Sequence, residues 1–146
     1  MSKVEVPPLI GALLRHPAQT IHRRLVTELN AAGYTDLRVA HIAVLSYPGP
    51  DGRRPGELAE QAGMSKQAMN QLLQSLETLG YLRRSDDEED GRARVVHFTE
   101  RGFAVWNKEY EILRQIETEW RETLGEEPFE QLKKLLGDVW ASDLVP

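Results

Sequence analysis

Residues 55–102 read PGELAEQAGMSKQAMNQLLQSLETLGYLRRSDDEEDGRARVVHFTERG, and this stretch contains the clearest signals for secondary structure in the chain. Its apolar residues predict a short helix over 57–62, and Gly63 then permits a tight turn. Ser65 is a suitable N-cap, because its hydroxyl can accept a bond from an N–H group at a helix start. The stretch therefore predicts a helix, a turn and a second helix in succession.

The expected second helix separates apolar from polar side chains. Its apolar positions, spaced at helical intervals of about 100° per residue, are Met69, Leu72, Leu73 and Leu76. The opposite face carries Lys66, Gln67, Asn70, Gln71 and Gln74. Amide side chains offer a donor and an acceptor together to adenine, and lysine reaches guanine or phosphate, so this face suits a DNA major groove. An ordinary solvated helix face would have the same composition.

A β-hairpin is expected after the second helix, which Gly80 ends. Two short runs with β-forming residues cover 81–84 and 94–98, and the segment between them contains the turn pair Asp90-Gly91. Arg92 and Arg94 lie beside the expected tip, where guanidinium groups can enter a minor groove. Alternatively, these arginines neutralise the neighbouring acids. Winged helix-turn-helix domains have these elements in this order.

Two helices are predicted before this stretch. Pro7 and Pro8 should open the first, Pro17 should kink or restart it, and Gly33 should end it. Asp36 is a suitable N-cap for the next helix. The prolines and glycines of 47–55 then predict a loop.

Two helices are also expected after the hairpin. The first begins at Thr99 and Glu100 and continues to Leu124, where Gly125 stops it, and Pro128 opens the second. The terminal helices have more large apolar residues than they can hide alone, so we expect them to form a dimer interface. The residues are Leu9, Leu13, Leu14, Leu113, Ile116, Trp120, Leu132, Leu136, Val139 and Trp140.

Length and composition indicate one globular chain. Its 146 residues are enough to bury a sizeable core, and 40% hydrophobic with 28% charged residues disfavours disordered and collagen-like classes. The 18 basic and 23 acidic residues give a net charge of −5, which argues against general binding to polyanions. Five of the acids are consecutive at 86–90, so a local basic face stays open.

Several classes of function are disfavoured by what the sequence lacks. Without cysteine there is no disulfide, thiolate zinc site, cysteine nucleophile or peroxide sensing through a thiol. No export signal or apolar run of about 18 residues is visible, so we expect a cytoplasmic protein without membrane contact. Phosphate-loop, GxSxG and HExxH motifs are absent, so we expect no enzyme and no cofactor. No metal site is expected from the scattered His16, His22, His41 and His97.

Residues 37–102 resemble the winged helix-turn-helix of the MarR family of bacterial transcriptional regulators. The motifs that carry the resemblance are LxxxGYLxR at the exit of the second helix, DxR at Asp90 and Arg92, and FTxRG before the next helix. One leading helix and two trailing helices also match. The implied fold is mainly α with a small β-hairpin: a winged helix-turn-helix DNA-binding domain over 37–102, with a helical dimerisation region over 1–36 and 103–146.

The resemblance implies a homodimer that binds a pseudo-palindromic operator in double-stranded DNA and regulates transcription, with repression expected. The residues that it places in the major groove are Ser65, Lys66, Gln67, Asn70 and Gln71. It places Arg92 in the wing and minor groove, with Asp90 orienting the wing. We add Gln74, Arg84 and Arg94 as candidate DNA-binding residues. The acidic run is heavier than is usual in the family, and a recognition helix rich in amides leaves the operator sequence unpredicted.

The resemblance also implies a small-molecule effector, with anionic aromatic compounds as first candidates. The effector-binding residues are unknown; a pocket between the DNA domain and the dimer helices would involve His22, His41, Tyr47, Trp106 and Tyr110. Aromatic core packing explains the aromatic members equally well. The alternative functions are a winged-helix protein-interaction module and a small-molecule-binding module, both without sequence-specific DNA binding.

Overall fold

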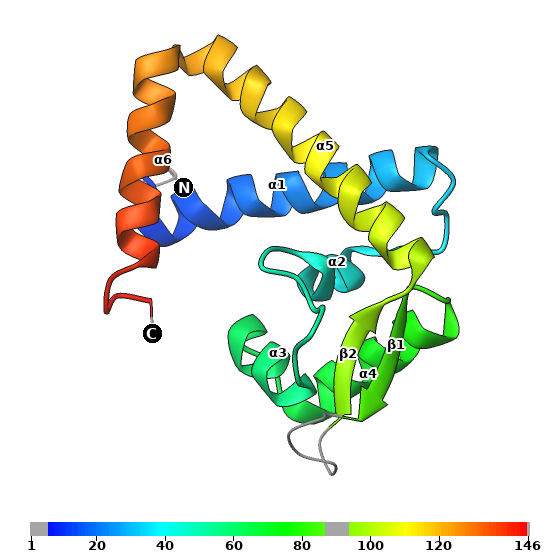
Figure 1. Cartoon of the computed structure of the whole chain (residues 1–146). Helices are drawn as coiled ribbons and strands as arrows, with labels where there is room; N and C mark the ends of the chain where they lie inside the picture. The colour runs from blue at the N-terminus through cyan, green and yellow to red at the C-terminus, as the bar shows by residue number, and fades with distance from the viewer. Residues whose placement is uncertain (1–5, 87–93, 146) are drawn as a thin grey trace, which may run out of the picture. The chain divides into compact units, whose positions relative to one another are not determined.

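We describe a computed structural model of the chain, in which residues 6–86 and 94–145 are described. Its elements are α1 (Ile10–Ala31), α2 (Val39–Leu45), α3 (Pro55–Ala62), α4 (Lys66–Thr78), β1 (Leu82–Asp86), β2 (Arg94–Phe98), α5 (Glu100–Leu124) and α6 (Glu126–Trp140) (Figure 1). The predicted class, mainly α with one small hairpin, is confirmed. The chain forms two compact units, Met1–Glu109 and Tyr110–Pro146, and α5 contributes to both.

The first helix begins later than predicted, and it does not restart at its internal proline. Helix α1 begins at Ile10, so Pro7 and Pro8 precede it. Pro17 lies inside α1, and the helix continues through it without a restart. One proline removes a single backbone donor, and the hydrogen bonds of adjacent turns keep the helix continuous. Gly33 follows the last turn with a φ of 108°, as expected for a helix end.

Helix α2 is not capped by Asp36, so that prediction is wrong. The N-cap is Arg38, whose backbone N–H donates to His41 Nδ1 at 3.0 Å. The Asp36 carboxylate instead accepts hydrogen bonds from Tyr81 and Arg101, which come from distant parts of the chain. A carboxylate held by these two donors is directed away from the start of α2. The loop predicted over 47–55 is confirmed up to Arg54.

The helix-turn-helix consists of α3 and α4. Gly63 joins them with a φ of 65° in the left-handed region, which glycine adopts without steric cost. Ser65 Oγ accepts a hydrogen bond from the Ala68 N–H at 3.1 Å, which confirms the predicted N-cap of α4. The apolar face of α4 packs inward, with Met69 and Leu73 fully buried.

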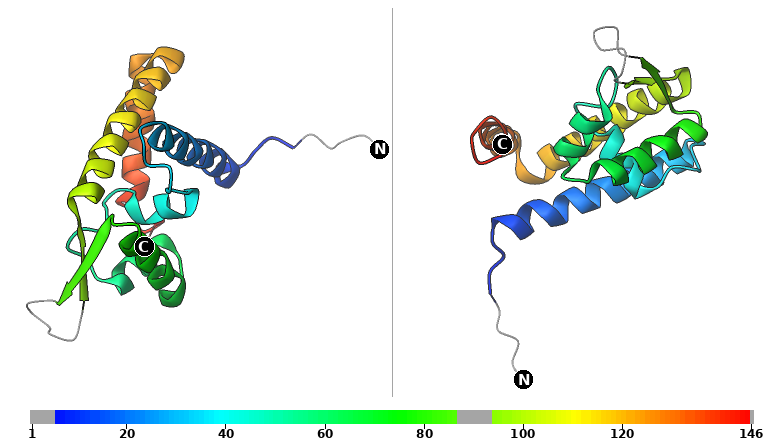
Figure 2. Two further views of the ribbon diagram at one scale, coloured as in Figure 1. Left: turned by 90° about the vertical axis from the view of Figure 1, so that its right-hand side faces the viewer. Right: turned by 90° about the horizontal axis from the view of Figure 1, so that it is seen from below.

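The hairpin pairs β1 with β2 in antiparallel register, from Leu82 opposite Phe98 to Asp86 opposite Arg94. The strands project from the helices of the same unit (Figure 2). An isolated bridge joins Arg53, in the loop before α3, to Val96 on β2. The sequence did not indicate this bridge, because a bridge of one residue has no periodicity. The expected turn at Asp90-Gly91 lies outside the described residues.

The unit Tyr110–Pro146 contains the second part of α5 and all of α6. Phe129 of α6 is buried, and the guanidinium of Arg121 lies 4.7 Å from the centre of the Phe129 ring. Arg121 also forms an ion pair with Glu130 at 2.9 Å, which joins the two helices. Helix α6 begins at Glu126, with Gly125 as N-cap, so Pro128 is its third residue and does not open it.

Glu109 on α5 is a buried carboxyl group. The residue is 3% exposed, and its Oε1 has no hydrogen-bond partner among the described residues. Burial raises the pKa of Glu109 from 4.5 to about 8, because a charge is less stable away from water. The carboxyl is therefore protonated in the folded protein at neutral pH.

We expect Glu109 to make the folded protein less stable as pH rises. Between pH 4.5 and about 8 the folded state holds a proton that the unfolded state releases, so its stabilising effect is complete below pH 4.5 and is lost as pH rises toward 8. Glu109→Gln keeps the shape of the uncharged side chain. It should remove this loss of folding stability, which is on the order of a few kcal/mol. Urea unfolding at several pH values measures it.

The control is Glu122→Gln, which removes an exposed carboxyl from the same helix. It should leave the pH dependence of unfolding as in the wild type. Equal pH dependence in the wild type and Glu109→Gln would show that Glu109 is charged in the fold at neutral pH.

Candidate nucleic-acid interface

The outer face of α4 carries the polar residues that the sequence singled out. Lys66, Gln67, Gln71 and Gln74 are exposed, and their side chains form no hydrogen bond or ion pair with other residues that the structure describes. They are spaced along one helix whose start is fixed by the Ser65 cap. This face can therefore offer three amides and one ammonium group to a ligand.

Asn70 lies on the same helix, but its amide is occupied. Its Oδ1 accepts a hydrogen bond from Arg84 Nη1 at 3.0 Å, and its Nδ2 donates to the Lys66 carbonyl at 3.0 Å. Asn70 is also only partly exposed. These two bonds use one donor and one acceptor of the amide and orient it toward Arg84 and Lys66.

Arg84 on β1 is the partner of Asn70, and both had been expected to face DNA. Its Nη2 donates to the Asn70 carbonyl at 3.3 Å, and its Nε lies 2.6 Å from Glu77 Oε1. The Arg84 side chain is 15% exposed. Arg84 thus joins the hairpin to α4 through three contacts, and the periodicity of α4 alone could not indicate this pairing.

The other predicted site residues are placed differently. Ser65 is exposed, and its oxygen is engaged in the helix cap while its O–H is still available as a donor. Arg94 is exposed at the outer end of β2. Arg92, with Asp90, lies outside the described residues, so its role in the wing stays a prediction.

The loop before α3 braces the hairpin. Asp51 Oδ1 accepts a hydrogen bond from the Phe98 N–H at 2.8 Å and lies 3.7 Å from His97 Nδ1. The Gly52 N–H donates to the Val96 carbonyl at 2.7 Å. These contacts hold β2 from its inner end, so the strand positions are fixed close to the core of the unit.

His41, a candidate effector contact, has a structural role instead. It is buried; its Nδ1 accepts from the Arg38 N–H, and its Nε2 lies 3.1 Å from Ser75 Oγ on α4. Burial, together with the nearby charge of Arg38, lowers the pKa of His41. Since Nδ1 accepts a backbone bond, the neutral ring with hydrogen on Nε2 fits both contacts.

For the other effector candidates, a role in an effector pocket stays a prediction. Trp106 packs against Phe98, with ring centres 5.6 Å apart, and Tyr47 is 72% exposed. Tyr110 belongs to the other compact unit. Among the described residues, no group of histidines and acids could hold a metal ion, and no helix is long and apolar enough to cross a membrane.

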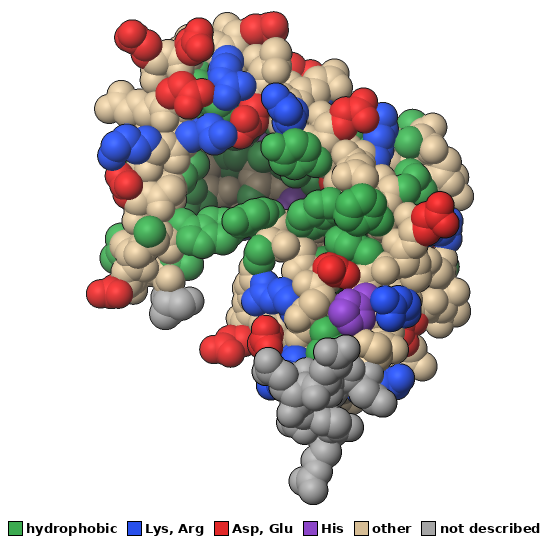
Figure 3. All heavy atoms as spheres, viewed as in Figure 1, with side chains coloured by type: hydrophobic (Ala, Val, Ile, Leu, Met, Phe, Trp, Pro, Cys, Tyr) green, Lys and Arg blue, Asp and Glu red, His purple; other side chains and the backbone are tan. Residues whose placement is uncertain are grey.

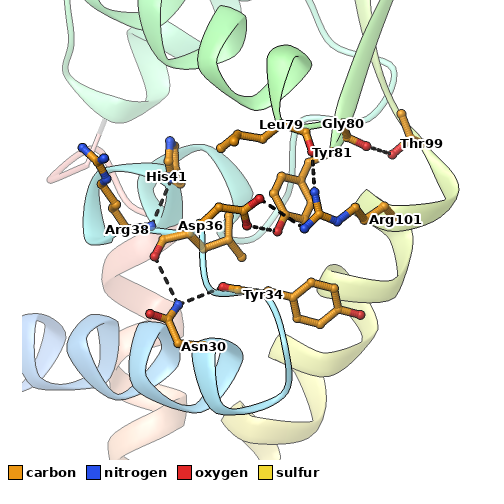
Figure 4. A network of polar contacts seen from close by, with 11 residues as sticks. Asn30, Tyr34, Asp36, Arg38, His41, Leu79, Gly80, Tyr81, Thr99 and Arg101 are labelled. Carbon is orange, nitrogen blue, oxygen red and sulfur yellow. Dashed lines mark hydrogen bonds and ion pairs between the residues drawn. The ribbon is translucent and has the colours of Figure 1, made fainter.

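Sequence reasoning missed a polar network at the end of α4. Asp36, Tyr81 and Arg101 contact one another there, although they come from three separate segments (Figure 4). Tyr81 and Arg101 stand inside the GYL and FTxRG motifs, so the motifs marked their positions. The partner of both, Asp36, had a plausible local role as a helix cap.

Comparisons with known proteins agree with this geometry. A sequence model of the MarR family matches residues 35–93. The transcriptional activatory protein BadR of Rhodopseudomonas palustris is 30% identical over 128 residues, which cover 86% of this chain and 71% of BadR. The chain belongs to the MarR family. The similarity to BadR extends well beyond the helix-turn-helix. The resemblance to the MarR family that the sequence motifs indicated is therefore confirmed.

Solved structures of MarR regulators share the fold. The reduced form of MarR from E. coli has a TM-score of 0.73 at 23% identity, with 92% of this chain and 98% of that chain covered. A mutant of S. aureus MepR bound to an oligodeoxyribonucleotide has a TM-score of 0.57 at 20% identity, with the same coverage. The chain therefore has the winged-helix fold of MarR transcriptional regulators.

We expect the Arg84–Glu77 pair to stabilise the junction of hairpin and α4. A double-mutant cycle with Arg84→Ala and Glu77→Ala should give a coupling energy of about 1–2 kcal/mol, because the Arg84 side chain is largely buried. Urea unfolding of the four proteins measures it. The Lys134–Asp138 pair on α6 is the control; its side chains are 74% and 62% exposed, so its coupling should stay below about 0.5 kcal/mol. Equal coupling in the two pairs would contradict a stabilising role for Arg84.

Proposed function

We propose that the protein is a homodimeric transcriptional regulator that binds a pseudo-palindromic DNA operator and represses transcription. The observation that carries the proposal is the exposed face of α4, where Lys66 and three glutamines lie on a capped helix of a MarR fold. A helix of this kind fits the major groove, and amides can bond to adenine through two atoms. The MepR structure with bound oligodeoxyribonucleotide supports the same use of the fold.

The structure refines which residues we propose for base reading. Gln67, Gln71 and Gln74 have exposed amides without partners among the described residues, whereas the Asn70 amide is bonded to Arg84 and Lys66. We therefore assign base contacts to the glutamines and a phosphate or guanine contact to Lys66. Arg94, at the outer end of β2, is proposed as a wing contact.

Exposed apolar side chains support a dimer with a second copy of this chain. On α1, Leu13 is 51% exposed, and on α6, Leu135 and Trp140 are 53% and 61% exposed. Hydrophobic side chains are plainly visible on the surface in Figure 3. Such residues are costly to leave in water, and the family resemblance implies a homodimer. Ile116, expected at the interface, is already buried within one chain.

Whether the protein represses or activates transcription, and whether an effector controls it, are also parts of the proposal. Repression is the expected mode, although BadR is described as an activatory protein, and a transcription assay with the operator overlapping or preceding a promoter distinguishes the two. A small aromatic effector that releases the operator is implied by the resemblance alone. Binding assays with added salicylate test this part.

We expect selection from a random pool of duplexes to enrich a two-fold symmetric site with half-sites about one helical turn apart. Gln71→Ala should then cost roughly 1–3 kcal/mol and relax preference at one base position. Lys66→Ala should weaken binding to all duplexes alike and reduce the salt slope by about 1 if it contacts phosphate.

Two variants are controls for this DNA experiment. Asn70→Ala should change base preference less than Gln71→Ala, because the Asn70 amide is oriented by bonds to Arg84 and Lys66. Gln115→Ala removes an exposed amide from α5 and should change nothing. If no duplex is enriched, the proposal that the protein recognises a DNA sequence is wrong, and a protein-interaction or ligand-binding module becomes the better proposal.

We expect the wild type to sediment as a dimer at micromolar concentration. Leu13→Glu or Leu136→Glu places a charge on an exposed apolar face of a terminal helix and should shift the protein toward monomer. Val39→Glu, at a 47% exposed position of α2 in the DNA-binding unit, should leave the dimer intact. A well-folded wild-type monomer at this concentration would contradict the dimeric proposal.

A further inference from the structure

The end of the recognition helix α4 is bonded to the start of α5 by Arg101. Its Nη1 donates a hydrogen bond to the Leu79 carbonyl, the C-cap of α4 (Figure 4). Its Nη2 lies 3.1 Å from Asp36 Oδ2, and its guanidinium stands 4.2 Å from the centre of the Tyr81 ring. One side chain of α5 therefore contacts three residues from two distant parts of the chain, and its charge is favourable at the carbonyl end of a helix.

Tyr81 and Asp36 complete the network. Tyr81 is fully buried and donates its hydroxyl hydrogen to Asp36 Oδ1, so the carboxylate receives one donor on each oxygen. Burial alone would raise the pKa of Asp36, but the bonds from Tyr81 and Arg101 outweigh it and lower the pKa. The carboxylate is thus charged at neutral pH and keeps both donors in place.

The backbone makes the same junction tight. Thr99 Oγ1 donates to the Gly80 carbonyl at 2.6 Å, and the Thr99 N–H donates to the Tyr81 carbonyl at 3.1 Å. A Cβ at Gly102 would collide with that Tyr81 carbonyl oxygen, so no larger residue fits there. The first turn of α5 consequently has little freedom to move against the end of α4.

We propose that Arg101, Tyr81 and Asp36 are positioning residues that fix the angle between the recognition helix and α5. Helix α5 continues without a break to Leu124, in the unit that bears part of the proposed dimer surface. If this angle is fixed, α4 moves together with α5. The three residues therefore set the distance between the recognition helices of the two copies in the proposed dimer. This inference rests on the proposed function, since the separation matters only to a dimer that reads two half-sites.

The test uses distances within one chain, measured without DNA. The protein has no cysteine, so Gln74→Cys on α4 and Asn107→Cys on α5, both at exposed positions, give a unique pair for nitroxide labels. Labelled chains are mixed with an excess of unlabelled protein, so that the pulsed-EPR distance is intramolecular. We expect one narrow distance in the wild type and a broader or shifted distribution in Arg101→Gln.

Two further variants separate positioning from a general loss of stability. Tyr81→Phe removes only the hydroxyl, keeps the ring and should broaden the distribution less, which gives a reading if Arg101→Gln does not fold. Arg114→Gln removes an exposed arginine of α5 whose guanidinium lies 5.8 Å from the centre of the Tyr110 ring, and it should match the wild type. Unchanged distributions in folded Arg101→Gln and Tyr81→Phe would overturn the proposal.

A second measurement connects the angle to DNA reading. Binding is measured on the duplex that the wild type selects and on versions with one base pair more or fewer between the half-sites. At the preferred spacing, Arg101→Gln should bind about tenfold more weakly than the wild type. Its affinity for a lone half-site should be unchanged, whereas a merely structural defect would weaken all duplexes in proportion. Spacing preference equal to the wild type would overturn the role in spacing. A wild type that selects no duplex would overturn the proposed function, while the distances still decide the coupling.

Discussion

The hydrogen bonds made by the carbonyl groups that follow α4 fix the position of the recognition helix within the unit Met1–Glu109. A helix leaves its last carbonyls without intrahelical partners, and buried ones must be satisfied elsewhere. The three carbonyls that follow α4, those of Leu79, Gly80 and Tyr81, accept bonds from Arg101 and Thr99 at the start of α5. These bonds connect the chain that leaves the recognition helix directly to the first turn of α5.

The hairpin is likewise held by charged side chains, Arg84 on its first strand and Asp51 in the loop before α3. Arg84 is directed onto α4 by Asn70 and Glu77, and Asp51 holds β2 through the Phe98 N–H. With these groups engaged and a net charge of −5, phosphate attraction alone is a weak basis for binding DNA. The discrimination would have to come from the exposed amides of α4, whose orientation the hairpin and α5 fix.

Local sequence signals predicted the elements, and they failed where distant residues compete. Ser65 was identified as a cap because its partner, Ala68, is three residues away. Asp36 had the same local signal, but Tyr81 and Arg101, 45 and 65 residues away, take its carboxylate. Asn70 likewise belongs to the polar face by periodicity, which contains no information on the strand that packs beside it.

Two carboxyl groups of this unit differ both in burial and in partners, and their pKa values shift in opposite directions: the Asp36 side chain is 30% exposed, whereas Glu109 is 3% exposed. Asp36 has a donor on each oxygen, so its pKa is lowered and the charge persists. Glu109 has an oxygen without a partner, and burial raises its pKa to about 8. Arg101 and Glu109 stand on the same helix, eight residues apart by number, so α5 presents a cation to the end of α4 and a neutral acid to the interior. A charge on Glu109 would oppose the burial of α5, whereas the charge of Asp36 holds the start of the same helix through Arg101, so the two carboxyls position α5 only in opposite protonation states.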